Sequence, residues 1–362
     1  MTQDIALYIH VPFCRRRCRY CSFVSYAHRQ TDIPAYVNAL KCELEQRANR
    51  EQVGSIYFGG GTPSLLPAEI LGDLLAAIRS LFDLDEAAEI TIEANPGTVD
   101  RTYLADIKKA GVNRLSLGIQ SLNDRELEML GRIHTAAEAI DSVKAARNAG
   151  FDNLNLDLIY GLPGQTMKEW QMALSGALAL KPEHLSLYAL SLEEGTPLYR
   201  MIEDKQLPAI DPDITADQYE LSENLLTQHG YRHYEISNWA LPGRECHHNL
   251  VYWHNQPYLG IGVAAHSHIG NHRFANTSNL DKYLTGTLLP EMDEAISPDL
   301  ELAETAILGL RLDEGIGVDT RYQEQVEELT AAGLLERAGR RVKLTGRGRL
   351  LGNEVFWRFL PE

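Results

Sequence analysis

Short hydrophobic runs alternate with longer amphipathic stretches through the first half of the chain. Apolar residues with period two predict strands, and apolar residues spaced three or four apart predict helices. Successive strand–helix units build a parallel sheet with right-handed crossovers, either open or rolled into a barrel. The predicted strands are Ala6–His10, Ser55–Phe58, Glu89–Ala94, Arg114–Ile119, Asn153–Tyr160 and His184–Leu190, and the predicted helices are Ala35–Asn49, Ala68–Leu81, Arg101–Ala110, Ala136–Ala149 and Met167–Leu180.

The alternation within these strands places polar side chains on one face. In the strand at 153–160, three leucines share one face, while Asn153, Asn155 and Asp157 share the other. The strands at 89–94 and 114–119 show the same alternation. A filled barrel would carry aliphatic side chains on its inner face. We therefore predict a partly open (β/α)6 barrel whose wet interior holds a ligand, although a water-filled interior without a ligand fits the same pattern.

The pattern changes after Glu193. A helix is predicted over Ala216–His229, and an irregular stretch rich in His, Tyr and Trp follows from Tyr231 to His272. A helical segment then starts near Ser297, and the chain ends in short helices and a basic, hairpin-like segment. We predict an α/β protein with a barrel over residues 1–235, a connecting region over 236–296, and a smaller C-terminal α+β, winged-helix-like domain over 297–362.

Composition and charge narrow the class of protein. Hydrophobic residues make up 44% and charged residues 23% of the 362 residues, which is typical of a globular protein. The formal net charge of −16 disfavours nucleic acid and anionic membranes as partners. The first ten residues lack the basic segment and apolar core of a signal peptide. These features predict a cytoplasmic protein with reduced thiols.

Three of the five cysteines lie close together. Cys14, Cys18 and Cys21 form a CxxxCxxC loop, and only Cys42 and Cys246 lie elsewhere. Thiolates hold iron–sulfur clusters, and three of them leave one iron of a [4Fe–4S] cluster open to another ligand. The alternatives are a zinc site, which usually has four protein ligands, and ordinary thiols.

Two further groups of residues follow the predicted strands. Gly59-Gly60-Gly61-Thr62-Pro63 exposes backbone N–H groups to a ligand or simply makes a tight turn, and it lacks the lysine of a P-loop. Glu93, Gln120 and Asp157 lie at or near the C-terminal ends of the third to fifth strands, where βα barrels carry their sites. Such carboxylates hold ammonium or ribose hydroxyl groups, or serve as structural caps.

A dense group of histidines and aromatic residues spans Cys246–His254, with His266 and His268 beyond it. Histidine is the commonest ligand of metals and haem iron. The aromatic neighbours suit a flat macrocycle, but a structural or zinc role fits the same residues.

Two basic clusters stand out. One surrounds the cysteines and would offset an anionic cluster or dock an acidic electron donor. The other, near the C-terminus, would bind acidic groups such as propionates or nucleic acid. Either cluster could instead be a solvated surface. The first consists of Arg15, Arg16, Arg17 and Arg19, and the second of Arg337, Arg340, Arg341, Lys343, Arg347 and Arg349.

Taken together, Tyr8, the CxxxCxYC loop and Gly-Gly-Gly-Thr-Pro resemble the radical S-adenosylmethionine superfamily. The finer resemblance is to the coproporphyrinogen III oxidase-like group and its haem-chaperone branch. His248-Asn249-x-x-Tyr252-Trp253 matches the HNxxYW motif of that branch, and Gly260–His268 resembles its following segment. The C-terminal part resembles a HemN-type C-terminal domain, so the resemblance covers essentially the whole chain.

The resemblance implies a role for each matching position. Cys14, Cys18 and Cys21 would hold a [4Fe–4S] cluster. Ala189 is the least consistent of the nucleotide-binding positions, because it lies on the other face of its strand from His184 and Ser186. S-adenosylmethionine would lie among Tyr8, Tyr20, Gly60, Gly61, Thr62, Glu93, Gln120, Arg132, Asp157 and Ala189, and haem among His248, Asn249, Tyr252 and Trp253, with His247, His266 and His268 as further candidate ligands.

Two departures from the oxidase pattern decide between branches of the group. Phe23 stands where the oxidase has a fourth cysteine, and the chain starts directly on the first strand. Both favour a haem chaperone that passes haem to an acceptor protein. The resemblance also implies a reduced flavodoxin- or ferredoxin-like electron donor, and peripheral membrane contact through the acceptor.

Two other functions remain to be weighed against this one. The first is an oxygen-independent coproporphyrinogen III dehydrogenase, which would decarboxylate two propionates oxidatively. The second is a radical enzyme that modifies nucleic acid, which the net charge of −16 disfavours.

Overall fold

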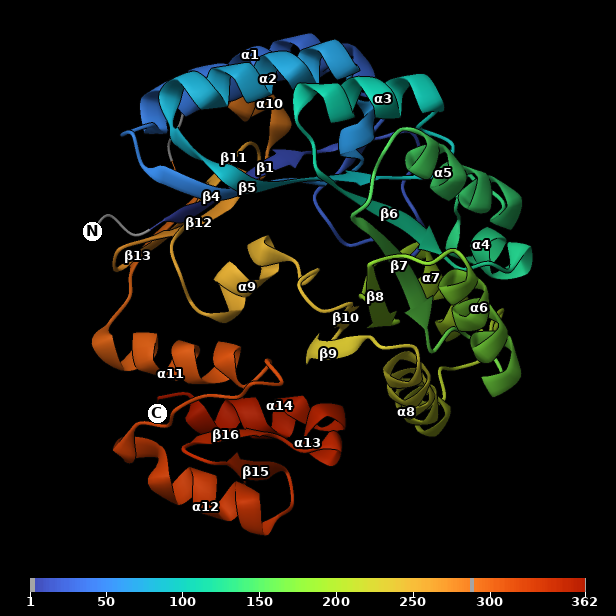
Figure 1. The fold of residues 1–362 in the computed structure, drawn as a ribbon, viewed down its shortest axis with the longest axis vertical. Coiled ribbons are helices and arrows are strands. Elements are labelled where there is room, and N and C mark those ends of the chain that lie inside the picture. The colour runs from blue at the N-terminus through green and yellow to red at the C-terminus, as the bar shows by residue number, and fades with distance from the viewer. Residues whose placement is uncertain (1–3, 287–289, 362) are drawn as a thin grey trace.

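The computed structural model describes residues 4–286 and 290–361 (Figure 1). Met1 and Glu362, the outer bounds of the predicted domains, lie outside the described residues. A twelve-stranded sheet dominates the structure. In spatial order its strands are β14 (Met292–Ala295), β13 (His272–Ala275), β12 (His266–Ile269), β11 (Tyr258–Ile261), β1 (Ile5–Val11), β4 (Gln52–Gly60), β5 (Asp83–Ala94), β6 (Arg114–Gln120), β7 (Leu154–Tyr160), β8 (His184–Ala189), β10 (Asn238–Ala240) and β9 (Arg232–Glu235).

The six predicted strands are confirmed as β1 and β4–β8, with ends that differ by a few residues apart from β5, which begins six residues earlier. These strands are neighbours in the sheet and all pair in parallel. They curve into an arc that opens towards the helix α9 (His247–Trp253) and the C-terminal part, as Figure 1 shows. This is the predicted α/β fold with a partly open barrel. None of the helices in the described part of the chain is both long and apolar enough to cross a bilayer.

Helices connect the parallel strands and cover the outer side of the arc (Figure 1). Their starts follow local sequence signals, because Thr135 and Thr166 each form a capping box with the glutamate three residues later. The predicted helices are confirmed within a few residues. The helices of this part are α1 (Ile33–Arg47), α2 (Ala68–Leu81), α3 (Arg101–Ala110), α4 (Asp124–Leu130), α5 (Ala136–Asn148), α6 (Met167–Ala179), α7 (Pro197–Glu203), α8 (Pro212–Gln228) and α10 (Leu280–Leu284), with 3-10 turns η1 (Gln30–Asp32) and η2 (Pro63–Leu65).

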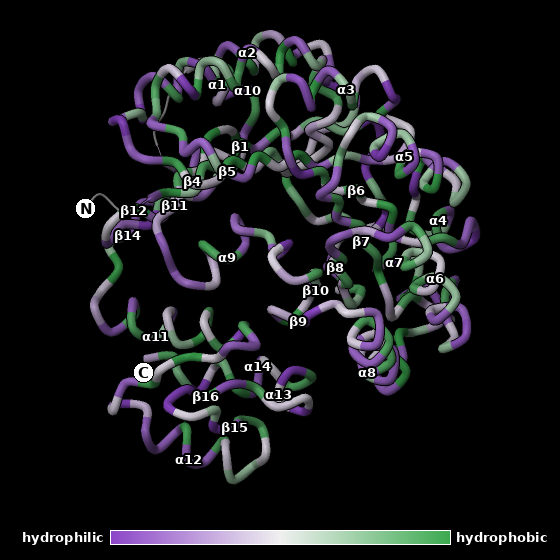
Figure 2. Tube along the Cα trace, in the orientation of Figure 1, coloured by the Kyte–Doolittle hydropathy of each residue, from purple (hydrophilic) through white to green (hydrophobic). Residues whose placement is uncertain are grey.

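The main hydrophobic core lies between the sheet and these helices. The leucine face of β7, Leu154, Leu156 and Leu158, is fully buried there, together with Trp170 of α6. In Figure 2 the covering helices show both green and purple segments, as expected where one face packs on the sheet and the other meets solvent. The predicted division of the strand faces is therefore confirmed: the apolar side packs on helices, which leaves the polar side to face the concave interior.

The prediction of an irregular stretch over residues 231–272 is wrong. This segment contains β9, β10, the helix α9 (His247–Trp253), β11 and β12. β11 pairs in parallel with β1, so that Gly260 lies opposite Tyr8. Strands of three or four residues are too short to show a period, and β11 pairs with β1, which lies at the other end of the sequence, so local pattern does not reveal these strands.

The C-terminal part has its own hydrophobic cluster, which includes Leu310, Val326 and Phe359. A β15–β16 hairpin confirms the predicted hairpin-like end. A bridge between Glu235 and Leu312 joins this part to the sheet region. Its elements are α11 (Pro298–Gly309), η3 (Thr320–Tyr322), α12 (Gln323–Ala331), β15 (Leu335–Ala338), β16 (Arg341–Leu344), α13 (Gly346–Leu350), α14 (Gly352–Phe356) and η4 (Trp357–Phe359).

Several residues of the C-terminal basic cluster form ion pairs within the chain. Arg341 pairs with Glu314 at 3.0 Å, Lys343 pairs with Asp313 at 3.2 Å, and Arg349 pairs with Glu223 at 2.7 Å. These three side chains hold the hairpin and α13 in place. They are therefore less available to an acidic ligand than the sequence alone indicates.

Candidate functional site

A cavity of about 590 Å³ lies on the concave side of the sheet. That volume is typical of a small-molecule site. The cavity brings together every predicted residue of the cluster and nucleotide sites, as well as three of the four predicted haem residues. The predicted residues that line it are Tyr8, Cys14, Cys18, Tyr20, Cys21, Gly60, Gly61, Thr62, Glu93, Gln120, Arg132, Asp157, Ala189, His248, Asn249 and Tyr252.

The cysteine loop is fixed to the barrel by its backbone. Cys14 ends the short strand β2 (Phe13–Cys14), which pairs with β3 (Tyr26–Ala27). The N–H of Arg19 donates to the carbonyl of Leu130 at 2.9 Å, and the carbonyl of Arg19 accepts from the N–H of Leu198 at 2.9 Å. These bonds hold the loop between Cys14 and Cys21 over the ends of the strands.

The thiols of the loop are free and face the cavity. Burial raises the pKa of both Cys14 and Cys21, so these groups favour the neutral thiol in the absence of a metal. Arg132 donates from its guanidinium to Sγ of Cys18 at 3.3 Å. Three sulfur donors beside a fixed positive charge fit an anionic iron–sulfur cluster.

Among the residues that the structure describes, no three His, Cys, Asp or Glu side chains converge as the ligands of one metal ion. A [4Fe–4S] cluster places different demands on its ligands, because each cysteine binds a different iron. The sulfurs around it therefore lie further apart than those around a single zinc ion.

The glycines at the end of β4 let two backbones pack closely beside the cysteine loop. Gly60 has a φ of 113°, which strains any residue with a side chain. A Cβ on Gly61 would lie 2.7 Å from the carbonyl oxygen of Phe13 and 3.1 Å from Sγ of Cys14. The backbone conformation at Gly60 and the close packing at Gly61 therefore require glycine, independently of any ligand. The same conformation directs the N–H of Gly60 to Glu93, at 3.2 Å.

Glu93 and Asp157 form an acidic wall in the middle of the cavity. Tyr57 donates to Glu93 at 2.9 Å, while Asn155 and Ser116 donate to Asp157 at 2.7 and 3.1 Å. Burial, and then the charge of Asp157, raise the pKa of Glu93 to about 7. Burial also raises the pKa of Asp157. The ionised pair would attract a cation or accept bonds from hydroxyl groups.

Gln120, Arg132 and Ala189 line the same cavity. Gln120 has a φ of 64° at the end of β6, a conformation that non-glycine residues adopt mainly where the surroundings impose it. Arg132 donates to the carbonyl of Gly118 at 2.6 Å, which fixes its position beside Cys18. Ala189, the last residue of β8, lines the cavity despite its parity.

α9 borders the cavity, and His248, near the start of this helix, lines it. Both ring nitrogens of His248 have partners at 2.9 Å: Nδ1 meets the hydroxyl of Ser55, and Nε2 meets that of Tyr252. Burial, and then the charge of Arg114, lower the pKa of His248 to about 3, so the ring is neutral. Glu89 accepts bonds from the N–H groups of His247 and His248 and thereby caps the helix.

The remaining predicted haem residues lie outside the cavity. Trp253 faces the C-terminal part, where the guanidinium of Arg311 lies 4.4 Å from the centre of its ring. His247 and His266 are exposed, and His268 is buried 3.7 Å from a carboxylate oxygen of Glu301. The structure therefore does not bring these four side chains to the site.

Several residues that the site contains were not predicted. Tyr57, Asn95, Arg114, Ser186 and Tyr188 also line the cavity. Tyr57 follows from the same alternation as Ser55 and Gly59, and Asn95 directly follows β5. Strand parity was thus the available signal for most of them.

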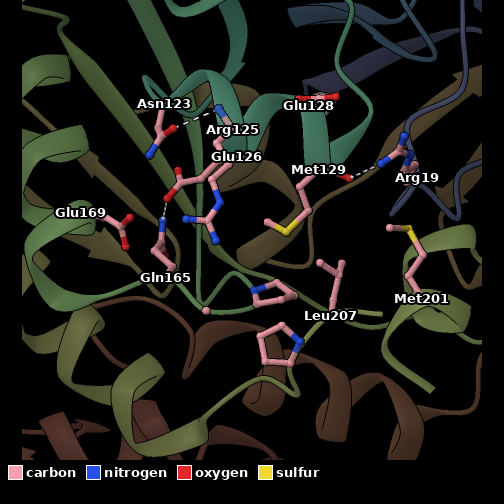
Figure 3. A pocket seen from close by; sticks show the side chains of 13 residues that line it. Arg19, Asn123, Arg125, Glu126, Glu128, Met129, Gln165, Glu169, Met201 and Leu207 are labelled. Carbon is pink, nitrogen blue, oxygen red and sulfur yellow. Dashed lines mark hydrogen bonds between the residues drawn. The ribbon is translucent and has the colours of Figure 1, made fainter. Parts of the chain in front are cut away.

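A smaller pocket of about 260 Å³ includes Arg19 of the cysteine loop in its lining (Figure 3). Figure 3 shows Arg19 beside Met129, to whose carbonyl it donates, and Gln165 pointing to Glu126. The bond from Arg19 to Met129 therefore helps to hold the cysteine loop against α4.

Comparison with known proteins identifies the family of this chain. Residues 8–175 match the Radical SAM superfamily, and residues 296–351 match the HemN C-terminal domain. The chain is 38% identical to a protein named heme chaperone HemW from Lactococcus lactis, covering 98% of this chain and 97% of the relative. The chain belongs to the HemW family. A HemW from Mycobacterium tuberculosis is 39% identical, with 98% and 94% covered.

Among solved structures, coproporphyrinogen III oxidase (HemN) from Escherichia coli has the same fold as this chain. The TM-score is 0.86 and the sequence identity 26%, over 99% of this chain and 90% of the other. The published description of that structure calls it a radical SAM enzyme. The predicted membership of the coproporphyrinogen III oxidase-like group, nearest to its haem-chaperone branch, is confirmed.

Proposed function

We propose that this protein is a haem chaperone, which binds haem, carries a [4Fe–4S] cluster with S-adenosylmethionine, and passes haem to an acceptor protein. One observation carries the proposal. In a chain that belongs to the HemW family, α9 and the CxxxCxxC loop both contribute residues to one cavity.

The residues of the chain divide into three groups in this proposal. Cys14, Cys18 and Cys21 hold the cluster, and Arg132 offsets its charge. Glu93 and Asp157 bind the cationic and hydroxyl groups of the nucleotide. When bound, the cluster and the nucleotide supply one-electron chemistry, while the protein supplies position, charge and protection from water. α9 supplies Asn249 and Tyr252 to the haem.

The proposal includes an electron donor of the flavodoxin or ferredoxin type. Arg15, Arg16 and Arg17 are exposed beside the cysteines, and Arg16 and Arg17 also line the cavity. An acidic donor would be attracted to this surface. A cytoplasmic location belongs to the same proposal, since it keeps the thiols of the loop reduced.

The second candidate is an oxygen-independent coproporphyrinogen III dehydrogenase. The structural similarity to HemN favours it. Against it stands Phe23, which lines the cavity and is 68% exposed, at the position where the oxidase pattern has its fourth cysteine. An apolar ring replaces a thiol at this point of the site.

Anaerobic reconstitution followed by two assays separates the candidates. We expect haem to bind stoichiometrically, with a shift of its absorption bands, and to move to an apo-haem protein on mixing. We expect no decarboxylation of coproporphyrinogen III with a chemical reductant and S-adenosylmethionine. Turnover of coproporphyrinogen III by a protein that binds no haem would establish the dehydrogenase instead.

A further inference from the structure

Arg114 presents a buried guanidinium to the cavity without a hydrogen bond to the described residues around it. The residue is 1% exposed, and it lines the cavity at the start of β6. Its nearest carboxylate, Glu89, lies 3.9 Å from Nε, beyond hydrogen-bond distance. Nε itself is buried without a partner. A guanidinium carries five N–H donors and stays charged, so this arrangement leaves an unused donor fork at the site.

The neighbours of Arg114 are already engaged with other partners. Glu89 accepts bonds from the thiol of Cys246 and from two backbone N–H groups at the start of α9. Tyr57 donates to Glu93, and the hydroxyl of Tyr234 meets Nε2 of His184 at 2.8 Å. Glu89 therefore offsets the charge of Arg114 without satisfying its donors.

The position of Arg114 separates it from the cluster. Gln120 lies at the opposite end of the same strand, near the cysteine loop, and six residues of strand span roughly 20 Å. Arg114 instead lies on the floor of the cavity, close enough to His248 for its charge to affect that ring. A ligand that reaches Arg114 therefore extends past the acidic wall towards α9.

We propose that Arg114 binds a carboxylate group of a ligand in this cavity. The planar guanidinium fork matches a carboxylate in shape and charge, and buried pairs of this kind bind in a bidentate manner. This inference rests on the proposed function, because haem carries two propionates and α9 borders the floor. S-adenosylmethionine also carries a carboxylate, so the test must distinguish the two sources.

The test compares ligands with and without a carboxylate. Haem is titrated against its dimethyl ester, and S-adenosylmethionine against its decarboxylated form, using the anaerobically reconstituted full chain. We expect the wild type to bind haem roughly ten- to a hundredfold more tightly than the ester, the usual effect of one charged hydrogen-bonding pair. Arg114→Gln should lose this preference, while Arg101→Gln, an exposed change on α3, should keep it.

Each outcome decides the matter. In one outcome the wild type prefers S-adenosylmethionine to its decarboxylated form but does not prefer haem to its dimethyl ester. If Arg114→Gln then loses the preference for S-adenosylmethionine, the carboxylate belongs to the nucleotide. Equal affinities within both pairs in the wild type would overturn the proposal, and this comparison does not depend on the folding of a variant. A wild type that binds no haem would overturn the proposed function, and the nucleotide pair would still decide the role of Arg114.

Discussion

The imidazole of His248 is bonded on one side to Ser55 and on the other to Tyr252, each at 2.9 Å. The first bond ties α9 to β4 of the sheet, and the second joins two residues one turn apart on α9. A neutral, buried ring with both nitrogens occupied acts on the cavity chiefly by positioning α9. To ligate iron, His248 would have to give up one of these bonds.

We therefore expect His248→Ala to weaken haem binding by displacing α9, and to leave the cluster intact. The loss should be roughly tenfold, since buried hydrogen bonds contribute about 1 kcal/mol each. Haem titration followed by absorption spectroscopy, together with iron and sulfide analysis, measures both effects.

Ser55→Ala is the informative companion. It removes the bond between His248 and β4 but keeps the imidazole ring. If His248 positions α9, this change should also weaken haem binding. If Nε2 of His248 ligates the iron, the absorption bands of haem should stay normal. His229→Ala, an exposed change at the end of α8, is the control. Loss of the cluster in His248→Ala would contradict this interpretation.

The sequence predicts most of this site through strand parity and spacing. Asn155 and Asp157 face the cavity because residues two apart share one side of a strand. α9 escapes such an analysis because it has only seven residues. Once the helix is known, the spacing explains the rest. His248 and Tyr252 are four residues apart and share a face, while Trp253 lies about 100° further round and points away.

The cluster should depend on Cys14, Cys18 and Cys21 alone. Replacing any of them by Ala should abolish stable loading of iron and sulfide, because a cluster with only two protein ligands is poorly held. Cys42→Ala and Cys246→Ala are matched controls that remove an exposed and a buried thiol. Cys246→Ala should keep the cluster, although it removes the contact with Glu89. Wild-type iron content in Cys18→Ala would refute this assignment.

Asp157 should contribute directly to nucleotide binding. Asp157→Asn keeps the shape of the side chain and removes its charge, so we expect the Kd for S-adenosylmethionine to rise roughly ten- to a hundredfold. Asp152→Asn, an exposed change close by in sequence, should leave the Kd unchanged. Isothermal titration under anaerobic conditions measures both values. Equal affinity in Asp157→Asn and the wild type would return Asp157 to a structural role.

Glu93 should make nucleotide binding pH-dependent. Its pKa of about 7 in the ligand-free protein means that the carboxylate ionises between about pH 6 and 8. A cationic ligand prefers the ionised form, so affinity should rise with pH through this range and then level off. The raised pKa has the opposite effect on folding stability. Because Glu93 ionises at lower pH in the unfolded chain than in the folded one, the free energy of unfolding of the ligand-free protein falls as pH rises from about 4.5 to about 7. Glu93→Gln should flatten both profiles, and profiles that remain steep in this variant would point to another group.

Trp253 should join the two parts of the protein instead of binding haem. Its ring lies under the guanidinium of Arg311, and a cation–π contact of this kind contributes about 0.5–2 kcal/mol. We expect Trp253→Ala to lower the free energy of unfolding by about 1–3 kcal/mol, because packing is lost with the contact. Urea unfolding followed by circular dichroism measures this change.

Two further variants make the prediction for Trp253 specific. Trp253→Phe keeps an aromatic face under Arg311, so it should recover most of the stability and bind haem within about threefold of the wild type, a difference of less than 1 kcal/mol. Trp357→Ala removes another tryptophan ring near an arginine, but that ring is 56% exposed, and its loss should cost much less. If Trp253→Phe were as stable as the wild type yet failed to bind haem, the ring would have to contact the ligand, and α9 would have to turn by roughly a quarter of a turn to bring it into the cavity.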